Sequence, residues 1–205
     1  MTFPKLLAFT SLAAFLAIGT AQATIISGTG TFADTGSTTN KLNFTGTVNN
    51  ADITNLNLAL GQKITFDDFL TITATDNAAS FFGTTRKDTL ATDFTFTLPT
   101  DATGSVTGKG IDTAFSVFGY ITGSTGDIVW NNPGEVDFAD GAILDISLSH
   151  AEFGSLWSPV AKNISVDATF QLVKAPIPVP EPGSFLLLGT ALAGLGLVLR
   201  RRTKA

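Results

Sequence analysis

Hydrophobic and polar residues alternate along several segments of this chain. The alternation is longest in residues 163–172, NISVDATFQL, and it recurs in residues 41–48, 56–60 and 93–98. Because successive side chains of a strand point to opposite faces, a period of two predicts strands with one buried face. The residues expected to face the core are Leu42, Phe44, Val48, Leu56, Leu58, Leu60, Phe94, Phe96, Leu98, Ile164, Val166, Ala168, Phe170 and Leu172.

Residues 63–73, KITFDDFLTIT, follow the same pattern with one exception. Strict alternation would place Asp68 on the inward face with the hydrophobic residues Ile64, Phe66, Leu70 and Ile72. Burial of a lone carboxylate is costly, so we predict a β-bulge at Asp67–Asp68 that changes the alternation at this point. The alternative interpretation is a buried carboxylate that binds a cation.

Turn-forming residues separate these segments. Glycine, proline, asparagine and aspartate punctuate residues 34–40, 75–77, 122–127, 131–134 and 140–141. No segment of the chain between the two termini shows a long stripe with the 3.6-residue period of a helix. Many short strands with such turns predict an all-β fold, a single antiparallel and jelly-roll-like β-sandwich at residues 24–174.

Residues 1–23 have the layout of a secretory signal peptide. Lys5 is the lone charge, residues 6–18 are an apolar run, and Ala21 and Ala23 form an A-x-A cleavage site. We expect signal peptidase to cut after Ala23. The mature chain then begins at Thr24, outside the cytoplasm.

The other terminus carries a second apolar segment, residues 185–199, which contains no charged residue. It is short against the roughly 20 residues that a helix needs to cross a bilayer. Basic clusters beside a membrane helix stay on the cytoplasmic side. We therefore predict a transmembrane helix at 185–199 and a cytoplasmic tail at 200–205, oriented by Arg200, Arg201 and Arg202.

A proline-rich linker, residues 175–184, precedes this helix. Pro180 and Pro182 flank Glu181, fix φ on both sides of it and lack amide donors. The stretch is expected to be extended and exposed, which is a conformation that a processing enzyme can bind. Together with the apolar segment and the arginines, Val179-Pro180-Glu181-Pro182 resembles the PEP-CTERM sorting signal, over about the last 27 residues of the chain.

The resemblance implies how the protein is exported and sorted, but it does not imply a biochemical activity. It implies a bacterium with a Gram-negative envelope, an inner-membrane intermediate, and a membrane-embedded exosortase that recognises the tail. Delivery is then to the cell surface or to an exopolysaccharide matrix. Val179, Pro180, Glu181 and Pro182 are recognition residues under this interpretation, not catalytic ones.

Net charge and cysteine content limit the possible functions of residues 24–183. Five of the 12 basic residues lie in the two terminal segments, whereas all 17 acidic residues lie between them, which leaves a net charge of −10. Nucleic-acid binding requires a basic surface and is therefore excluded. The chain has no cysteine, so neither disulfides nor cysteine-based metal sites and nucleophiles can form.

Two stretches resemble catalytic carboxylate motifs. Asp34-Thr35-Gly36 is the tripeptide of aspartic proteases, but that mechanism needs two carboxylates, and no second copy occurs because Asp112-Thr113 is followed by Ala114. The other stretch, WNNPGEVDFAD at residues 130–140, resembles the E-x-D-x-x-E signature of jelly-roll glycoside hydrolases.

In the hydrolase interpretation, Glu135 is the nucleophile, Asp137 supports it, and Asp140 stands where the acid/base glutamate belongs. Retaining hydrolysis needs two carboxyls about 5 to 5.5 Å apart. Asp140 has a shorter side chain than glutamate and lies in a sequence typical of a hairpin turn, Ala139-Asp140-Gly141. We therefore keep a retaining β-glucan hydrolase only as an alternative function.

Other chemistry receives less support from the sequence. The glycine-rich stretch TGSVTGKG around Lys109 lacks the spacing of a phosphate-binding loop and is interpreted as a turn. His150 is the chain's single histidine and is expected at a strand end. Acidic turns could supply oxygen ligands for calcium, yet the spacing of known calcium loops is missing. We assign no catalytic residue, metal or cofactor, and leave calcium binding open.

Taken together, these patterns predict a non-enzymatic exported protein with a structural or adhesive role in exopolysaccharide or biofilm. Its expected partners are signal peptidase, the inner membrane before processing, exosortase and the exopolysaccharide itself. A carbohydrate-binding module is the first alternative, and the glucan hydrolase is the second.

Overall fold

The structure is a computed structural model that describes residues 23–36, 42–76, 84–117, 120–155, 162–177 and 189–192. The described residues form eleven β-strands and one short helical turn. The strands are β1 (Thr24–Asp34), β2 (Leu42–Val48), β3 (Leu56–Leu58), β4 (Lys63–Asp76), β5 (Thr84–Leu98), β6 (Ala102–Val117), β7 (Tyr120–Trp130), β8 (Gly134–Asp137), β9 (Ile143–Leu148), β10 (Ala151–Ser155) and β11 (Lys162–Lys174).

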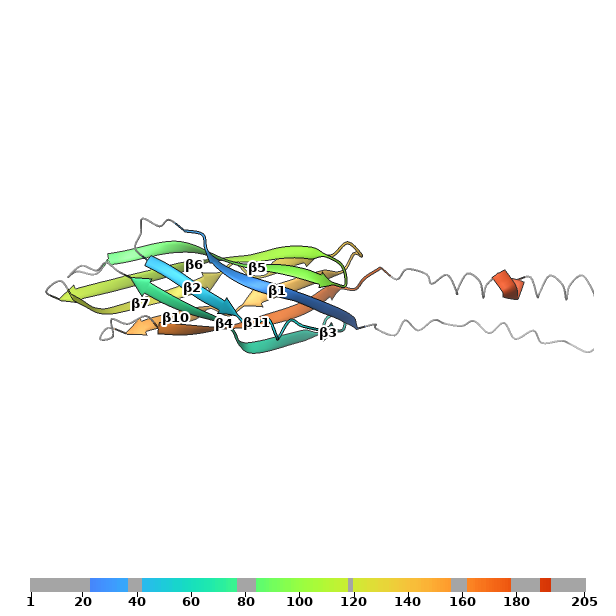
Figure 1. Cartoon of the computed structure of the whole chain (residues 1–205), viewed down its shortest axis with the longest axis horizontal. Coiled ribbons are helices and arrows are strands. Elements are labelled where there is room, and N and C mark those ends of the chain that lie inside the picture. The colour runs from blue at the N-terminus through green and yellow to red at the C-terminus, as the bar shows by residue number, and fades with distance from the viewer. Residues whose placement is uncertain are drawn as a thin grey trace, which may run out of the picture.

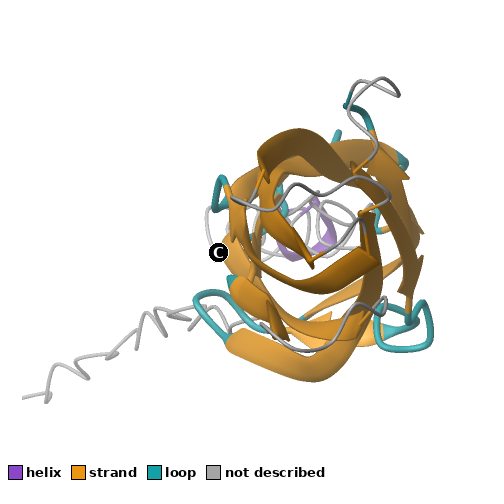
Figure 2. Cartoon of the chain, turned by 90° about the vertical axis from the view of Figure 1, so that its left-hand side faces the viewer, coloured by secondary structure: helices purple, strands orange, loops and turns teal. Residues whose placement is uncertain are grey.

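The strands make two curled antiparallel sheets that face each other, so the predicted all-β sandwich is confirmed (Figures 1 and 2). One sheet has the order β10-β7-β6-β5-β1-β3 and the other has the order β2-β4-β11-β9-β8. The finer jelly-roll topology stays a prediction. Strands β5, β6 and β7 are consecutive neighbours in one sheet, and three such strands occur both in a meander and within a Greek key.

A shared core fills the space between the sheets. Every inward residue predicted for the strand at 163–172 is at most 4% exposed. The Phe170 ring lies at its centre, edge-on to the rings of Phe69 and Phe94, with centroids 5.5 and 6.2 Å away. Burial of such faces against one another is the main stabilising term of a sandwich without disulfides.

Two predicted core residues are wrong. Leu60 is 54% exposed and Leu98 is 42% exposed. Strand β3 ends at Leu58, so Leu60 lies in the turn that follows it. Leu98 pairs with Ser27 at a register irregularity in the β1–β5 ladder, at the last residue of β5. Both side chains lie where the sheets end and no neighbouring strand covers them.

The predicted bulge at Asp67–Asp68 is confirmed. Three residues of β4, from Asp67 to Phe69, face one residue of β11, Asp167. Asp68 has a φ of 56° and is exposed; its N–H donates to Asp167 Oδ1 over 3.0 Å, and its carboxylate accepts from the Ser165 hydroxyl. Asp68 is therefore not a buried cation ligand, and Phe69 takes the core position, fully buried.

Two predicted turns are strand instead. The glycine-rich stretch around Lys109 belongs to β6, and residues 122–127 belong to β7. The β6 glycines admit large side chains: a Cβ on Gly108 would lie 2.6 Å from Trp130 Cε3, and one on Gly110 would lie 2.3 Å from Phe44 Cζ. The residue type that suggests a turn in the sequence serves here to make room for aromatic rings.

The predicted turns at residues 131–134 and 140–141 are found between strands. The first connects β7 to β8, and the second lies inside the β8–β9 hairpin, where Gly141 has a φ of 85°. Asp140 Oδ1 accepts the Ala142 N–H over 3.0 Å, the bond that closes an Asx-type turn.

Both ends of the described domain lie at the same end of the sandwich, where β1 begins and the segment after β11 stops at Ile177 (Figure 1). We call this the exit end. Beyond it, the structure describes only Gly189–Leu192, which is helical. In the part of the chain that the structure describes, no helix is long and apolar enough to span a bilayer. The predicted helix at 185–199 is thus not supported here, and most of it lies outside the described residues.

Candidate functional site

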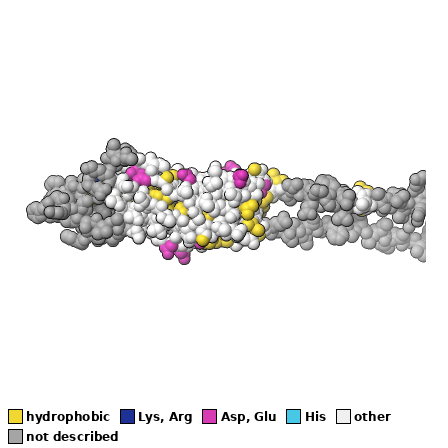
Figure 3. Space-filling view, in the orientation of Figure 1, with side chains coloured by type: hydrophobic (Ala, Val, Ile, Leu, Met, Phe, Trp, Pro, Cys, Tyr) yellow, Lys and Arg dark blue, Asp and Glu magenta, His cyan; other side chains and the backbone are white. Residues whose placement is uncertain are grey.

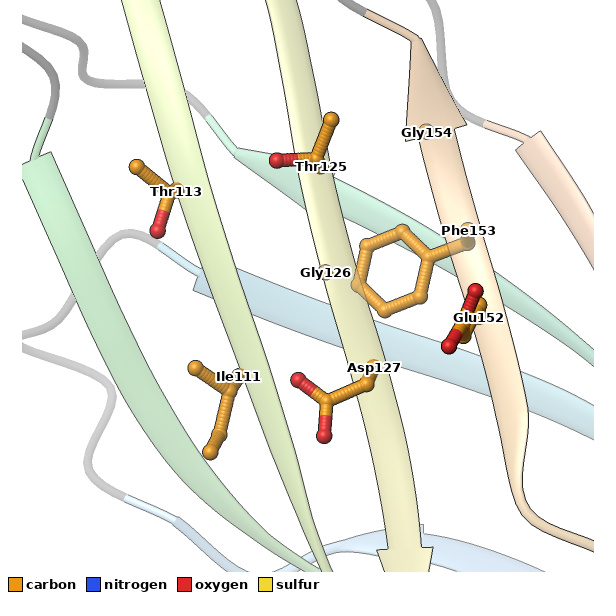
Figure 4. Close-up of a pocket in the computed structure, with 8 residues that line it drawn as sticks. All are labelled: Ile111, Thr113, Thr125, Gly126, Asp127, Glu152, Phe153 and Gly154. Atoms are coloured by element: carbon orange, nitrogen blue, oxygen red, sulfur yellow. The ribbon is translucent and has the colours of Figure 1, made fainter.

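An open groove of about 700 Å³ lies on the outer face of the first sheet, across β6, β7 and β10 (Figure 4). Strand alternation turns Thr113, Thr125, Asp127 and Glu152 into this groove, because each occupies an outward position of its strand. Asp127 and Glu152 are directly opposite each other in the β7–β10 ladder. Two carboxylates therefore share one end of the groove.

The floor of the groove is tightly packed. Phe153, on the edge strand, points inward and packs edge-on against Phe44, with ring centroids 6.1 Å apart. Gly126 leaves room for this ring, because a Cβ there would lie 2.4 Å from Phe153 Cζ and 2.1 Å from the Ile111 carbonyl oxygen. The groove is consequently a fixed feature of the sheet rather than a gap between loops.

The lining side chains favour a ligand rich in hydroxyls. Carboxylates accept hydrogen bonds, and threonine hydroxyls both donate and accept them. Thr113 already shares a hydrogen bond of 2.9 Å with Thr85 across β5 and β6. Phe153 is the aromatic residue among the described lining residues, and its ring does not face outward, so the groove offers no stacking platform for a sugar.

The candidate hydrolase residues lie on the β8–β9 hairpin of the other sheet. Glu135 and Asp137 are both exposed and share the outward face of β8, as the sequence predicts. Asp140 lies in the hairpin turn and is held there by the Ala142 N–H, so it does not join their strand face. Instead Asp145, on β9, is the direct neighbour of Glu135.

The protease-like and histidine candidates have structural roles. Asp34 Oδ1 accepts the Gly36 N–H over 3.1 Å and its Oδ2 accepts the Phe44 N–H over 2.9 Å, which joins β1 to β2. His150 lies just before β10, at a strand end as predicted, and its Nδ1 accepts the Trp130 N–H over 3.0 Å. Both polar groups hold backbone donors that the ladders leave unpaired.

Among the described residues, no group of three or more histidine, cysteine, aspartate or glutamate side chains could hold a metal ion. The two acidic pairs, Asp127 with Glu152 and Glu135 with Asp145, were not identified from the sequence. Each member occupies an outward position of an alternating strand, but the pairing depends on register. Only the ladder brings together residues that are 25 and 10 positions apart in the chain.

The remaining predicted functional residues belong to the termini. Ala23 is exposed, next to the first residue of β1, where a signal-peptide cut would leave the strand intact. Ala21, the residues Val179, Pro180, Glu181 and Pro182, and Arg200, Arg201 and Arg202 lie outside the described residues.

Comparison with known protein families identifies the C-terminal segment. Residues 178–202 match the PEP-CTERM protein-sorting motif, which covers all four residues of the Val-Pro-Glu-Pro stretch and the three arginines. The match begins directly after Ile177, where the described domain ends. Comparisons with curated proteins and with solved structures found no match to the chain.

Proposed function

We propose that this chain, which carries a PEP-CTERM sorting motif and is thereby an exosortase-sorted exported protein, serves as a non-enzymatic structural or adhesive component of the cell surface or exopolysaccharide matrix. The observation that carries the proposal is the motif match at residues 178–202, immediately after a single β-sandwich. Residues 185–199 would anchor the intermediate in the inner membrane, with Arg200, Arg201 and Arg202 on the cytoplasmic side.

The fold suits such a role. Both ends of the domain lie at the exit end, so the rest of the sandwich points away from the attachment point (Figure 1). Its outer faces carry mainly polar residues at the exposed positions of each ladder, such as the threonine pair Thr65 and Thr169. A domain with such polar outer faces is accessible to a hydrated polysaccharide.

Intact-mass analysis of protein from the membrane and extracellular fractions of the native host tests the processing. We expect a mass that starts at Thr24 and ends near Pro182, because the tail is removed after recognition. The matched control changes Pro180, Glu181 and Pro182 to alanine, which keeps the apolar segment and the arginines. The control should stay in the membrane fraction with a mass that runs from Thr24 to Ala205.

One outcome would contradict the proposed processing. If wild-type protein retains residues 200–205 in cells that have a working exosortase, the tail is a permanent anchor. The chain would then be an anchored surface protein with a proline-rich stalk.

A carbohydrate-binding module is the second candidate, and the hydroxyl-compatible groove on β6, β7 and β10 favours it. Retention on a column of the host's exopolysaccharide should fall severalfold in the double variant Asp127→Asn, Glu152→Gln. The control Glu135→Gln, Asp145→Asn neutralises the other acidic pair, on the opposite sheet, and should leave retention unchanged. Equal losses in both variants would point to net charge rather than to the groove.

The same column distinguishes a hydrolase from a binding module. Release of shortened sugar by the wild type, lost in Glu135→Gln, would show catalysis by the β8 carboxylates. Retention without turnover would favour a binding module.

A further inference from the structure

Five large hydrophobic side chains are exposed around the exit end of the sandwich. Their exposed fractions run from 39 to 64%, values far above those of the core. We call this set the apolar rim; its members are Ile25, Leu60, Leu98, Val173 and Ile177. Figure 3 shows hydrophobic side chains gathered at the same end of the domain, beside the point where the terminal segments begin.

Backbone contacts bring members of the rim together from distant parts of the chain. The Gly61 N–H donates to the Leu172 carbonyl over 2.7 Å, which sets the turn bearing Leu60 beside Val173 at the end of β11. On the first sheet, the β1–β5 ladder pairs Ser27 with Leu98, two residues from Ile25.

Ile177 completes the rim above the β8–β9 hairpin. Its N–H donates to the Asp140 carbonyl over 2.9 Å, and its side chain lies over Gly141. This contact fixes the chain as it leaves the domain. The last described residue before the sorting motif is therefore held against the sandwich with a hydrophobic side chain that is 64% exposed.

Single exposed hydrophobic residues are ordinary, whereas a group of them in one place marks an interaction surface. Leu60 and Leu98, which the alternation pattern wrongly predicted to be core residues, both belong to this group. Val129 is exposed to the same extent as Leu98, 42%, but it pairs with Lys109 along the body of the first sheet, away from the rim. It provides a matched reference position.

The tether to the tail is short. Only residues 178–184 separate Ile177 from residue 185, the first residue of the segment that we assign to the membrane. A fully extended chain over this distance spans at most about 30 Å. With residues 185–199 in the membrane, the exit end would lie within this distance of the bilayer while the tail is attached.

We propose that the apolar rim rests in the interfacial layer of the membrane before the tail is cleaved. This inference rests on the proposed function, because it takes residues 185–199 as the membrane segment. The exposed apolar side chains would lose contact with water there, as those of interfacial helices do. The domain is thus held against the bilayer, and the linker that contains Glu181 stays at the membrane surface where a membrane-embedded enzyme acts.

Two lysines next to the rim are also suited to contact with a lipid membrane. Lys63 begins β4 and Lys174 ends β11, and both are exposed beside the turn that carries Leu60. Long basic side chains can cover apolar surface while the ammonium reaches lipid phosphates. Asp101 is also exposed near this end, in the β5–β6 turn, so apolar area rather than charge must provide most of the attraction.

The chain's lack of cysteine allows a direct test with single labels. Single-cysteine variants Leu60→Cys, Leu98→Cys and Val129→Cys of the chain from Thr24 to Ala205 are labelled with an environment-sensitive fluorophore. They are then reconstituted into vesicles of phosphatidylethanolamine and phosphatidylglycerol that carry a headgroup-level quencher lipid. Flotation of the vesicles reports attachment by the tail, and quenching reports contact by the rim.

We expect all three variants to float with the vesicles, with labels at positions 60 and 98 quenched at least twofold more than the label at 129. A second pair of substitutions, Ile25→Ser with Val173→Ser, should reduce the quenching at position 60 toward that at 129 without preventing flotation. This result would show that the rim itself, and not the tether alone, holds the domain on the lipid.

Three results would overturn the inference. Flotation with equal quenching at 60, 98 and 129 would leave the tail as an anchor and remove the rim as a membrane contact. Failure to float would overturn the membrane assignment of the tail and the rim contact together. Proximity between rim labels of separate molecules in lipid-free detergent would identify a second copy of the chain, not the bilayer, as the occupant.

Discussion

At the scale of single residues, glycine makes room in the core for large side chains of the neighbouring strand and of the opposite sheet. The inward face of β6 carries Gly104, Gly108 and Gly110, each beneath a large side chain of another strand. Glycine within a strand weakens it locally but permits such close approach. The packing of Trp130 and Phe44 therefore depends on the absence of a side chain at these positions.

The substitution Gly108→Val tests this packing. A Cβ at this position would lie 2.6 Å from Trp130 Cε3 and 3.0 Å from the Val129 carbonyl oxygen, so the added side chain must displace the indole or the strand. Overpacking of this kind costs about 1–3 kcal/mol. Denaturant unfolding should show this loss of stability.

The substitution Thr103→Val is the control. Thr103 is exposed on the opposite face of the same strand, where valine has a high strand propensity and nothing to displace. We expect its free energy of unfolding to stay within about 0.5 kcal/mol of the wild type. Equal effects of the two substitutions would show that β6 is not packed as described.

At the scale of elements, the edge strands carry paired acidic residues. Strand β10 ends one sheet and β8 ends the other. Each places a glutamate opposite an aspartate of its neighbour, Glu152 with Asp127 and Glu135 with Asp145. Like charges directly opposite destabilise a ladder, but charges on an edge oppose association with another sheet. Each acidic pair therefore lowers the stability of its ladder but protects the edge strand from aggregation with another sheet.

Neutralising one member should separate these two effects. We expect Glu152→Gln to raise the free energy of unfolding by about 0.2–1 kcal/mol, because it removes the repulsion with Asp127. The gain should shrink at high salt, which screens exposed charges. Light scattering near the unfolding transition should rise at the same time, because the β10 edge loses its charge.

Asp93→Asn is the matched control for this change. Asp93 is exposed on the internal strand β5, opposite the uncharged residues Thr31 and Ser105. It should alter neither stability nor scattering by a comparable amount. A stabilisation as large as that of Glu152→Gln would indicate a general effect of net charge.

At the scale of the whole molecule, the position of the two chain ends determines the orientation of the domain. The first strand begins and the last strand ends at the exit end, beside the apolar rim (Figures 1 and 3). A sorting motif attached at this point leaves the groove on β6, β7 and β10 away from the tether. The intact-mass and quenching experiments act at this scale, since both depend on where the tail joins the domain.

Much of the sandwich could be predicted from local pattern. Alternation in residues 163–172 places every inward residue of β11 correctly, because a period of two is a property of strand geometry and needs no knowledge of neighbours. The bulge at Asp67–Asp68 was predictable for a similar reason, since a carboxylate in an apolar row signals a break. Strand β6 could not be predicted in this way, because glycine is common both in turns and beneath packed rings.

The all-β class, most inward positions and the sorting motif can be predicted from the chain alone, because each is encoded in adjacent residues as a two-residue period or a contiguous motif. The strand order, the acidic pairs and the apolar rim become visible only in the folded domain. These features join residues that are distant in the chain, and strand register and the ends of the sheets determine which of them meet. A pattern within one strand cannot show which neighbour, if any, will cover its last residue, and this is why Leu60 and Leu98 looked like core residues and are not.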